Sequence, residues 1–232
     1  MDSINNQPPE PVVDSTTLEV HSIWDTIQGE GPFAGRKATF VRMAGCNICC
    51  RFCDSDYTSN RDKYNAIDLT NDSRFDHSRL IVITGGEPFR QNIKPFIDGL
   101  LEKGVSIQVE TNGIICPRWL KDYSPNIWFR GLTIVCSPKT PKVAEELFAF
   151  TGALKYVVQD GYIADDGLPS STLGMKHSVA RPPSDWKGEI YIQPLDEQNE
   201  EANQRNLKAA AESCLKYDYR LCVQMHKLAG LD

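Results

Sequence analysis

The alternation of short apolar, β-rich runs with helix-like segments restricts the fold more than any other feature of the sequence. Strand–helix–strand repetition with short links is typical of parallel βαβ units. The expected strands cover residues 18–24, 38–43, 80–84, 105–110, 132–136, 154–158, 190–193 and 220–224, and the expected helices cover 93–103, 143–150 and 197–217. Such strands can form a doubly wound sheet or a barrel, but a complete eight-unit barrel needs about 250 residues. For a chain of 232 residues we therefore expect an α/β fold in which parallel strands form an incomplete TIM-type barrel.

The alternation defines one domain, over residues 18–232, and leaves residues 1–17 outside it. That first segment is polar and contains three prolines, so we expect a flexible or loosely docked tail. Within the domain, residues 55–78 are polar and residues 160–187 are rich in Gly, Pro and Ser. Both segments are expected to be loops or lids.

The composition excludes several classes of protein. The chain carries 31 acidic and 25 basic side chains, a formal net charge of −6. This balance disfavours direct binding to nucleic acid, because a phosphate backbone requires a basic face. No stretch approaches the roughly 20 apolar residues of a membrane span. The first residues lack the basic and apolar regions of a secretory signal, so we expect a cytoplasmic protein whose eight cysteines stay reduced.

Polar motifs follow five of the expected strands. They are TGGEP at 84–88, ETNG at 110–113, SPK at 137–139, QPLD at 193–196 and QMHK at 224–227. In parallel α/β folds, functional residues gather beyond the C-terminal ends of the strands. The five motifs therefore predict the rim of a single site.

Four of the cysteines, Cys46, Cys49, Cys50 and Cys53, lie within eight consecutive residues. Structural zinc would draw all its ligands from one short loop, whereas such sites normally use two separated pairs. A redox C-x-x-C pair is a second alternative. The third is a [4Fe–4S] cluster held by Cys46, Cys50 and Cys53, which leaves one iron open to an exchangeable ligand. The C-x3-C-x2-C spacing and the preceding Gly45, which allows a tight turn, favour the cluster. Cys49 has no assigned role.

This cysteine spacing, placed directly after an expected strand, resembles that of the radical S-adenosylmethionine (SAM) superfamily. The resemblance implies that the open iron chelates SAM and that reductive cleavage yields a 5′-deoxyadenosyl radical. The TGGEP run resembles the motif of that superfamily that contacts the SAM amino group. Two glycines at a strand end let the backbone approach a ligand, and Glu87 offers an acceptor for an ammonium group.

The flanking sequences resemble one family more closely, the 7-carboxy-7-deazaguanine synthases of queuosine biosynthesis. The residues that carry the resemblance are IQGEG at 27–31, GR at 35–36, FVR at 40–42, DSDY at 54–57 and the C-terminal run from 224. The family resemblance implies ring contraction of 6-carboxy-5,6,7,8-tetrahydropterin to 7-carboxy-7-deazaguanine with loss of ammonia. It also implies SAM and Mg²⁺ as cofactors, an electron donor such as flavodoxin, and a homodimer. The product could feed transfer-RNA queuosine or DNA modification.

The pterin substrate needs polar groups for its flat edge and its carboxylate. The resemblance implies substrate contacts from Ile27, Gln28, Gly29, Glu30, Arg42, Thr84, His226 and Asp232, with Glu30 and His226 as catalytic residues. Gln28 and Glu30 can pair with ring groups, and Arg42 can fork onto a carboxylate. The alternatives are a solvated turn for 28–31, a surface ion pair for Arg42 and a core histidine for His226. In some relatives the chain ends six residues after this histidine, so the terminal carboxylate of Asp232 would reach the substrate.

The resemblance also assigns the cofactor contacts. The implied SAM-binding residues are Phe52, Cys53, Asp54, Gly85, Gly86, Glu87, Asn112, Ser137, Pro138, Lys139, Gln193, Pro194, Leu195 and Asp196. Ser55 is the implied magnesium ligand, since Mg²⁺ prefers oxygen ligands. A loop serine or a helix N-cap is the alternative for Ser55, and Asp54 and Asp56 are rival metal ligands.

Two other functions are compatible with parts of the sequence. One is a radical SAM activase that generates a glycyl radical on a partner protein. The other is a zinc- or cluster-stabilised binding module without catalysis. Gln28, Glu30, Arg42 and the spacing from His226 to Asp232 argue against the activase, whereas a binding module would be colourless or would never cleave SAM.

Overall fold

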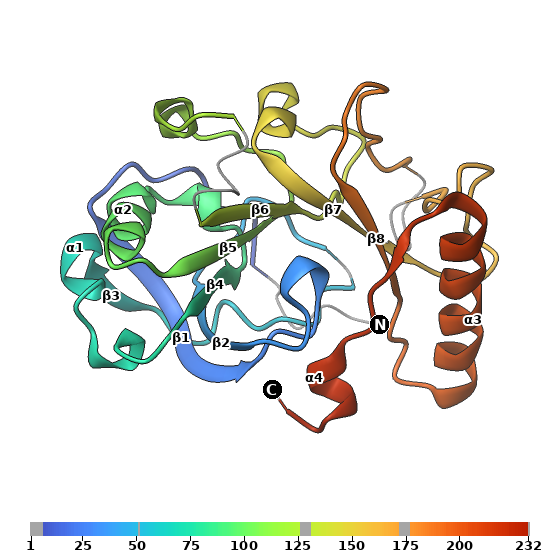
Figure 1. Cartoon of the computed structure of the whole chain (residues 1–232), viewed down its shortest axis with the longest axis horizontal. Coiled ribbons are helices and arrows are strands. Elements are labelled where there is room, and N and C mark those ends of the chain that lie inside the picture. The colour runs from blue at the N-terminus through green and yellow to red at the C-terminus, as the bar shows by residue number, and fades with distance from the viewer. Residues whose placement is uncertain (1–6, 51, 126–130, 172–176, 232) are drawn as a thin grey trace.

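The computed structural model describes residues 7–50, 52–125, 131–171 and 177–231. Within these ranges, nine strands form one sheet in the order β3-β1-β2-β4-β5-β6-β7-β8-β9 (Figure 1). The strands are β1 (Thr17–Ile27), β2 (Lys37–Met43), β3 (Asp62–Asn65), β4 (Leu80–Gly85), β5 (Ser106–Thr111), β6 (Leu132–Cys136), β7 (Thr151–Val158), β8 (Glu189–Pro194) and β9 (Arg220–Leu221). From β2 to β9 all neighbours are parallel, whereas β1 and β3 are antiparallel additions at one edge. The sheet has two edges, so the barrel is incomplete, as expected.

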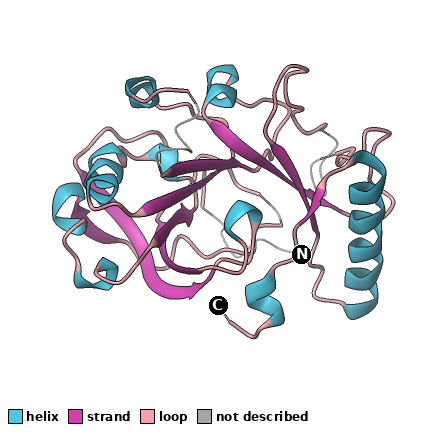
Figure 2. Ribbon diagram, in the orientation of Figure 1, coloured by secondary structure: helices cyan, strands magenta, loops and turns pink. Residues whose placement is uncertain are grey.

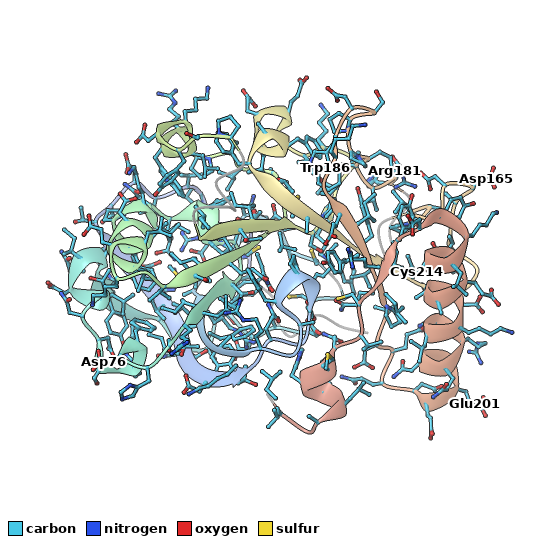
Figure 3. The ribbon with its side chains drawn as sticks, viewed as in Figure 1. Asp76, Asp165, Arg181, Trp186, Glu201 and Cys214 are labelled. Atoms are coloured by element: carbon cyan, nitrogen blue, oxygen red, sulfur yellow. The ribbon has the colours of Figure 1, made fainter. Side chains whose placement is uncertain are left out.

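Helices lie mainly on the outer side of the curved sheet (Figures 1 and 2). The α-helices are α1 (Ala66–Leu69), α2 (Lys94–Glu102), α3 (Glu200–Tyr217) and α4 (Met225–Leu228), and the 3-10 helices are η1 (Gly31–Phe33), η2 (Ser73–Phe75), η3 (Pro88–Arg90), η4 (Arg118–Asp122) and η6 (Glu145–Ala149). Helix α3 begins after Asn199, whose side chain accepts the Ala202 N–H, and ends at Asp218 in the left-handed region. Its buried residue Cys214 lies on the side that faces the sheet (Figure 3).

The two faces of the parallel strands have different partners, because successive side chains alternate between them. Ile81, Ile107 and Leu154 belong to the large apolar core between the sheet and the outer helices. On the inner face, Val82 and Ala153 belong to smaller apolar clusters. Towards the carboxyl ends of the strands the inner face turns polar.

The expected strands are all present, with ends that shift by at most three residues, although the last is shortened to Arg220–Leu221. Two expectations were wrong. Residues 143–150 do not form an α-helix but the 3-10 helix η6, because Ala144 is held by the Gly113 carbonyl and β7 starts at Thr151, which leaves five residues for the turn. Residues 55–78 are not only a loop, since they contain β3, α1 and η2.

Residues 7–17, expected to belong to a flexible or loosely docked tail, lie against the domain. The Val13 N–H donates to the Arg90 carbonyl over 2.7 Å, and the Thr16 carbonyl accepts the Ala66 N–H over 2.9 Å. Residues 7–17 therefore stay against the domain, because both hydrogen bonds are made by backbone atoms of this segment. A search of the described helices for one long and apolar enough to cross a membrane found none.

Candidate active site

A half-buried carboxylate, Glu110, lies at the centre of the polar inner face. Its Oε1 accepts from the Gln28 amide over 3.0 Å and from the Gln108 amide over 2.8 Å, and its Oε2 accepts from the Thr84 hydroxyl over 3.0 Å. The donors come from the end of β1, from β4 and from β5 itself. The parallel register explains the convergence, since Val82 pairs with Gln108 and thereby sets Thr84 beside Glu110.

An ion pair between Glu30 and Lys155 forms the second part of the polar face. The Gln224 amide also donates to Glu30, over 2.8 Å. Burial alone would raise the pKa of Glu30, but the Lys155 ammonium and the Gln224 hydrogen bond hold it below its ordinary value. Burial likewise opposes the charge of Lys155, yet Glu30 and Glu110 raise its pKa. Both groups are therefore charged near neutral pH.

His226 lies at one side of this polar face, against the turn that follows β1. A Cβ atom on Gly29 would fall 1.9 Å from Nδ1 of His226, so only glycine fits there. The Nδ1 atom is buried and has no hydrogen-bond partner among the described residues. Burial lowers the pKa of His226, which favours the neutral imidazole. Through this contact, residues 27–31 pack directly against the C-terminal segment.

Arg42 presents a guanidinium with unused donor capacity. Its Nη1 donates to the Asp56 carbonyl over 3.4 Å, and its Cζ lies 4.9 Å from the centre of the Trp24 ring. The buried Nε has no hydrogen-bond partner among the described residues. Burial lowers the pKa of Arg42, and Asp54 and Asp56 partly offset that effect. A guanidinium held in this way is suited to bind an anionic ligand group.

The cysteine loop begins where β2 ends. Burial raises the pKa of Cys46 to about 12 and that of Cys50 to about 11, and Lys139 partly offsets the second shift. The Cys53 N–H donates to the Cys50 carbonyl over 3.2 Å, so these two cysteines lie on one tight turn. Among the described residues, no three His, Cys, Asp or Glu side chains converge on a single metal ion. Each thiolate of a [4Fe–4S] cluster binds a different iron, and three thiols on one short loop, one buried and two partly buried, fit that donor set.

Gly86 explains how the cysteine loop can approach the end of β4. A Cβ atom on Gly86 would fall 1.9 Å from the Gly45 carbonyl oxygen and 3.0 Å from the Cβ atom of Cys46. Any side chain at this position would push the two loops apart. The GGE motif and the first cysteine are therefore packed backbone to backbone.

Comparisons with known proteins agree with this geometry. The 7-carboxy-7-deazaguanine synthase of Rhodospirillum rubrum is 38% identical over 228 residues, which cover 93% of each chain. The enzyme of the same name from Rickettsia prowazekii is 31% identical, over 94% of this chain and 91% of its own. This chain belongs to the 7-carboxy-7-deazaguanine synthase family. No family model matches the chain.

Two solved structures share the fold of this family member. QueE from Escherichia coli superposes with a TM-score of 0.67 and 21% identity, covering 90% of this chain and 94% of its own. SuiB from Streptococcus suis, solved with S-adenosylmethionine bound, gives a TM-score of 0.51 and 12% identity over 79% of this chain and 45% of its own. The incomplete barrel is thus the fold that this chain shares with both solved structures.

Glu87 differs from the role expected from the GGE motif. Its carboxylate is fully buried and accepts from the Thr111 hydroxyl (2.7 Å), the Phe89 N–H (3.0 Å) and the Asn112 N–H (2.8 Å). The side chain points into the domain because the backbone at Gly85, with φ at 122°, turns the chain tightly against β2. Within the described chain, the Glu87 carboxylate supports the loop between β4 and η3 through these three hydrogen bonds.

The buried Glu87 carboxyl should make the stability of the apoprotein depend on pH. Burial raises the pKa of Glu87 from 4.5 to about 7, so its ionisation opposes folding. Its stabilising contribution is complete below about pH 4.5 and is lost as the pH rises through about 7. We expect the difference in unfolding free energy between the wild-type protein and Glu87→Gln to fall by up to about 3 kcal/mol over this window. Urea unfolding at several pH values tests this, and a difference that does not change with pH would contradict it.

The other residues expected to bind SAM lie around the cysteine loop. Asn112 donates to Asn47 over 2.7 Å and so ties the end of β5 to the loop. Lys139 donates to Ser137 over 2.9 Å and lies 5.8 Å from the centre of the Phe52 ring.

Lys227 forms ion pairs with two further residues that were expected to bind SAM. It binds Asp54 at 3.2 Å and Asp196 at 3.3 Å, so the cysteine loop, the end of β8 and α4 are connected. Gln193 is buried, and its Oε1 has no hydrogen-bond partner among the described residues. Pro194 ends β8, and the Leu195 N–H donates to the Val158 carbonyl.

Two expected residues remain less defined. The Ser55 hydroxyl donates to Asp54 over 3.5 Å, at the edge of the cysteine loop. Asp232 lies outside the described residues, so its role is not placed by the structure. Ile27 ends β1 and leads directly into the wall built by Gly29 and His226.

Lys155, Glu110, Gln108 and Gln224 are site residues that were not predicted individually. A signal for two of them was present in the sequence. Lys155 stands between Leu154 and Tyr156, and Glu110 ends an apolar run, so each is a charge in a strand that should be buried. Arg42, inside the apolar strand β2, carries the same signal.

Proposed function

We propose that the protein is a radical SAM carbon–nitrogen lyase, with its active site in one domain over residues 18–232. The proposed reaction converts 6-carboxy-5,6,7,8-tetrahydropterin to 7-carboxy-7-deazaguanine with loss of ammonia. Membership of the synthase family supports the reaction. The observation that carries it is the buried polar face, where Glu110, Glu30 and Arg42 provide two acceptors and one cation for a flat, carboxylated heterocycle.

Cys46, Cys50 and Cys53 would hold a [4Fe–4S] cluster, since they are three thiols on one short loop, one buried and two partly buried. When bound, the cluster would supply the electron that cleaves SAM and the open iron that chelates it. Asn112 and Lys139 would bind SAM beside this loop. The Asn112 side chain connects the end of β5 to the loop, and the Lys139 side chain lies over the Phe52 ring. The remaining proposed SAM contacts are Phe52, Asp54, Gly85, Gly86, Ser137, Pro138, Gln193, Pro194, Leu195 and Asp196.

The chain provides complementary groups for each part of the pterin. Arg42 has unsatisfied donor capacity for the carboxylate. Glu110 and Glu30 offer acceptor oxygens suited to the N–H groups of the ring, and Gln28 orients Glu110. His226 is held neutral by burial and has an unpartnered Nδ1 within the described chain. A neutral imidazole at this position can accept or donate one proton at the side of the polar face.

The finer assignments are part of the same proposal. Ser55 would ligate Mg²⁺ together with the substrate carboxylate, because both offer the oxygen atoms that this ion prefers. The terminal carboxylate of Asp232 would contact the substrate. We further propose a cytoplasmic homodimer that receives electrons from a donor such as flavodoxin.

The deciding experiment is an anaerobic assay of the reconstituted protein with SAM, reductant and the carboxypterin, with and without Mg²⁺. Mass spectrometry should detect 7-carboxy-7-deazaguanine, with more product when Mg²⁺ is present. Formation of 5′-deoxyadenosine without the deazaguanine would exclude the proposed substrate and favour an activase. A protein that binds iron but never cleaves SAM would exclude radical chemistry altogether.

A further inference from the structure

The N-terminal segment, residues 7–16, lies against the turn that carries the first cysteine of the loop. The Glu10 N–H donates to the Cys46 carbonyl over 2.8 Å. Three residues later, the Val13 N–H donates to the Arg90 carbonyl over 2.7 Å. The segment is thus held by its own backbone both at the cysteine and at the end of η3.

A buried arginine lies beneath this contact. Arg90 is only 1% exposed, and its guanidinium binds Glu10 at 3.2 Å and Glu19 at 3.1 Å. Both carboxylates also bind Arg61, so two positive and two negative charges balance. A buried guanidinium requires such partners, because an unpaired charge in the interior is strongly destabilising. Glu10, from the N-terminal segment, supplies half of the negative charge.

The network fixes the backbone of residues 44–46. Each of the three carbonyls accepts a hydrogen bond. The donors are the Arg90 guanidinium (3.0 Å) and the Gln91 amide (3.1 Å) for Ala44, the Glu87 N–H (3.0 Å) for Gly45, and the Glu10 N–H (2.8 Å) for Cys46. The loop after β4 therefore holds the first two carbonyls, whereas the N-terminal segment holds the carbonyl of the cysteine itself.

The turn at Gly45 is packed tightly against Arg90 and Glu10. Gly45 has a φ of 78°, and a Cβ atom there would fall 2.6 Å from the Arg90 guanidinium and 2.8 Å from the Glu10 carboxylate. Displacing the N-terminal segment would expose the charge of Arg90 and release the carbonyl of Cys46 in one event.

We propose that residues 7–16 and Arg90 form a brace that fixes the backbone of Cys46, with Glu10 and Arg90 as positioning residues for the first ligand of the iron–sulfur cluster. The consequence for the cluster rests on the proposed function. A cluster held by only three thiolates depends on each of them, so a brace on one ligand should slow the loss of iron. Neither residue touches the reacting atoms; both act through Cys46.

Three variants test the brace: Glu10→Gln, Arg90→Met and deletion of residues 2–14. In the cluster-free protein, we expect iodoacetamide to alkylate Cys46 about tenfold faster in the variants, the effect of one lost charge-assisted hydrogen bond. Cys136, which is fully buried in β6, reports global opening and should keep its wild-type rate. In the reconstituted protein, iron release to a chelator should accelerate by a similar factor. Peptide mass spectrometry and chelator absorbance provide the two rates.

Arg181→Met is the matched control. Arg181 binds Asp166 at 2.7 Å and lies on the same side of the molecule as α3 (Figure 3), and its loss should leave both rates unchanged. Unchanged alkylation of Cys46 in all three variants, or an equal rise at Cys136, would overturn the brace. If the wild-type protein takes up no cluster, the proposed function fails, while the alkylation rates still decide whether the brace exists.

Discussion

A Cys50→Ala variant is expected to form no stable [4Fe–4S] cluster, to lack the visible absorbance of the reconstituted protein and to produce no 5′-deoxyadenosine. Burial raises the pKa of the Cys50 thiol to about 11, so the site stabilises a thiolate poorly unless a metal binds it. Removal of one of three thiolates leaves two irons without a protein ligand. Turnover of the carboxypterin should fall to background.

The adjacent Cys49→Ala variant is the matched control for this prediction. Cys49 is exposed and lies outside the C-x3-C-x2-C spacing, so its removal should leave iron content and turnover at wild-type values. Circular dichroism of both apoproteins should match the wild type, because alanine at a partly exposed cysteine changes stability by only about 1 kcal/mol. If Cys49→Ala loses the cluster and Cys50→Ala keeps it, the assignment of ligands is wrong.

Most of the fold was predictable because parallel strands buried on both faces form apolar runs that stand out in a sequence. The strand that was missed, β3, is an edge strand whose residues Asp62, Lys63 and Asn65 are exposed. It therefore has no apolar run to detect. Its pairing with β1, with Leu18 opposite Tyr64, depends on a partner more than 40 residues away in the sequence.

The site was predictable only as far as single residues carried a signal. Arg42 could be identified because it is a charge inside an apolar strand. Lys155 carried the same signal, but its partner Glu30 lies 125 residues away, and only the barrel brings them together. For Glu87 the sequence motif predicted which residue matters but not where its side chain points. The structure shows that this side chain turns into the domain and is fully buried.

The ion pair between Glu30 and Lys155 leads to the second prediction of large effect. In a Lys155→Met variant, Glu30 would remain buried, and among the described residues the Gln224 amide would be the hydrogen-bond donor left to its carboxylate. Breaking a buried pair from one side costs about 3–5 kcal/mol. The pKa of Glu30 should rise above its ordinary value, because desolvation would no longer be offset by the ammonium. A protonated Glu30 is a poor acceptor for a ring N–H, so kcat/KM should fall by about two orders of magnitude or more.

A double variant, Lys155→Met with Glu30→Gln, separates stability from catalysis. It removes the uncompensated charge, so the unfolding free energy should recover most of the loss, while turnover stays low because residue 30 no longer offers a carboxylate to the substrate. The unfolding free energy of the single variant should also fall as the pH rises. A carboxyl such as Glu30, whose pKa would be higher in the folded than in the unfolded protein, contributes its full stability below the unfolded pKa and loses it as the pH rises through the folded pKa. Lys94→Met, which breaks a partly exposed pair with Asp98 on α2, should change stability by less than about 1 kcal/mol. If Lys155→Met retained wild-type turnover, or if the double variant were no more stable than the single one, the pair would not be what holds Glu30 in its charged form.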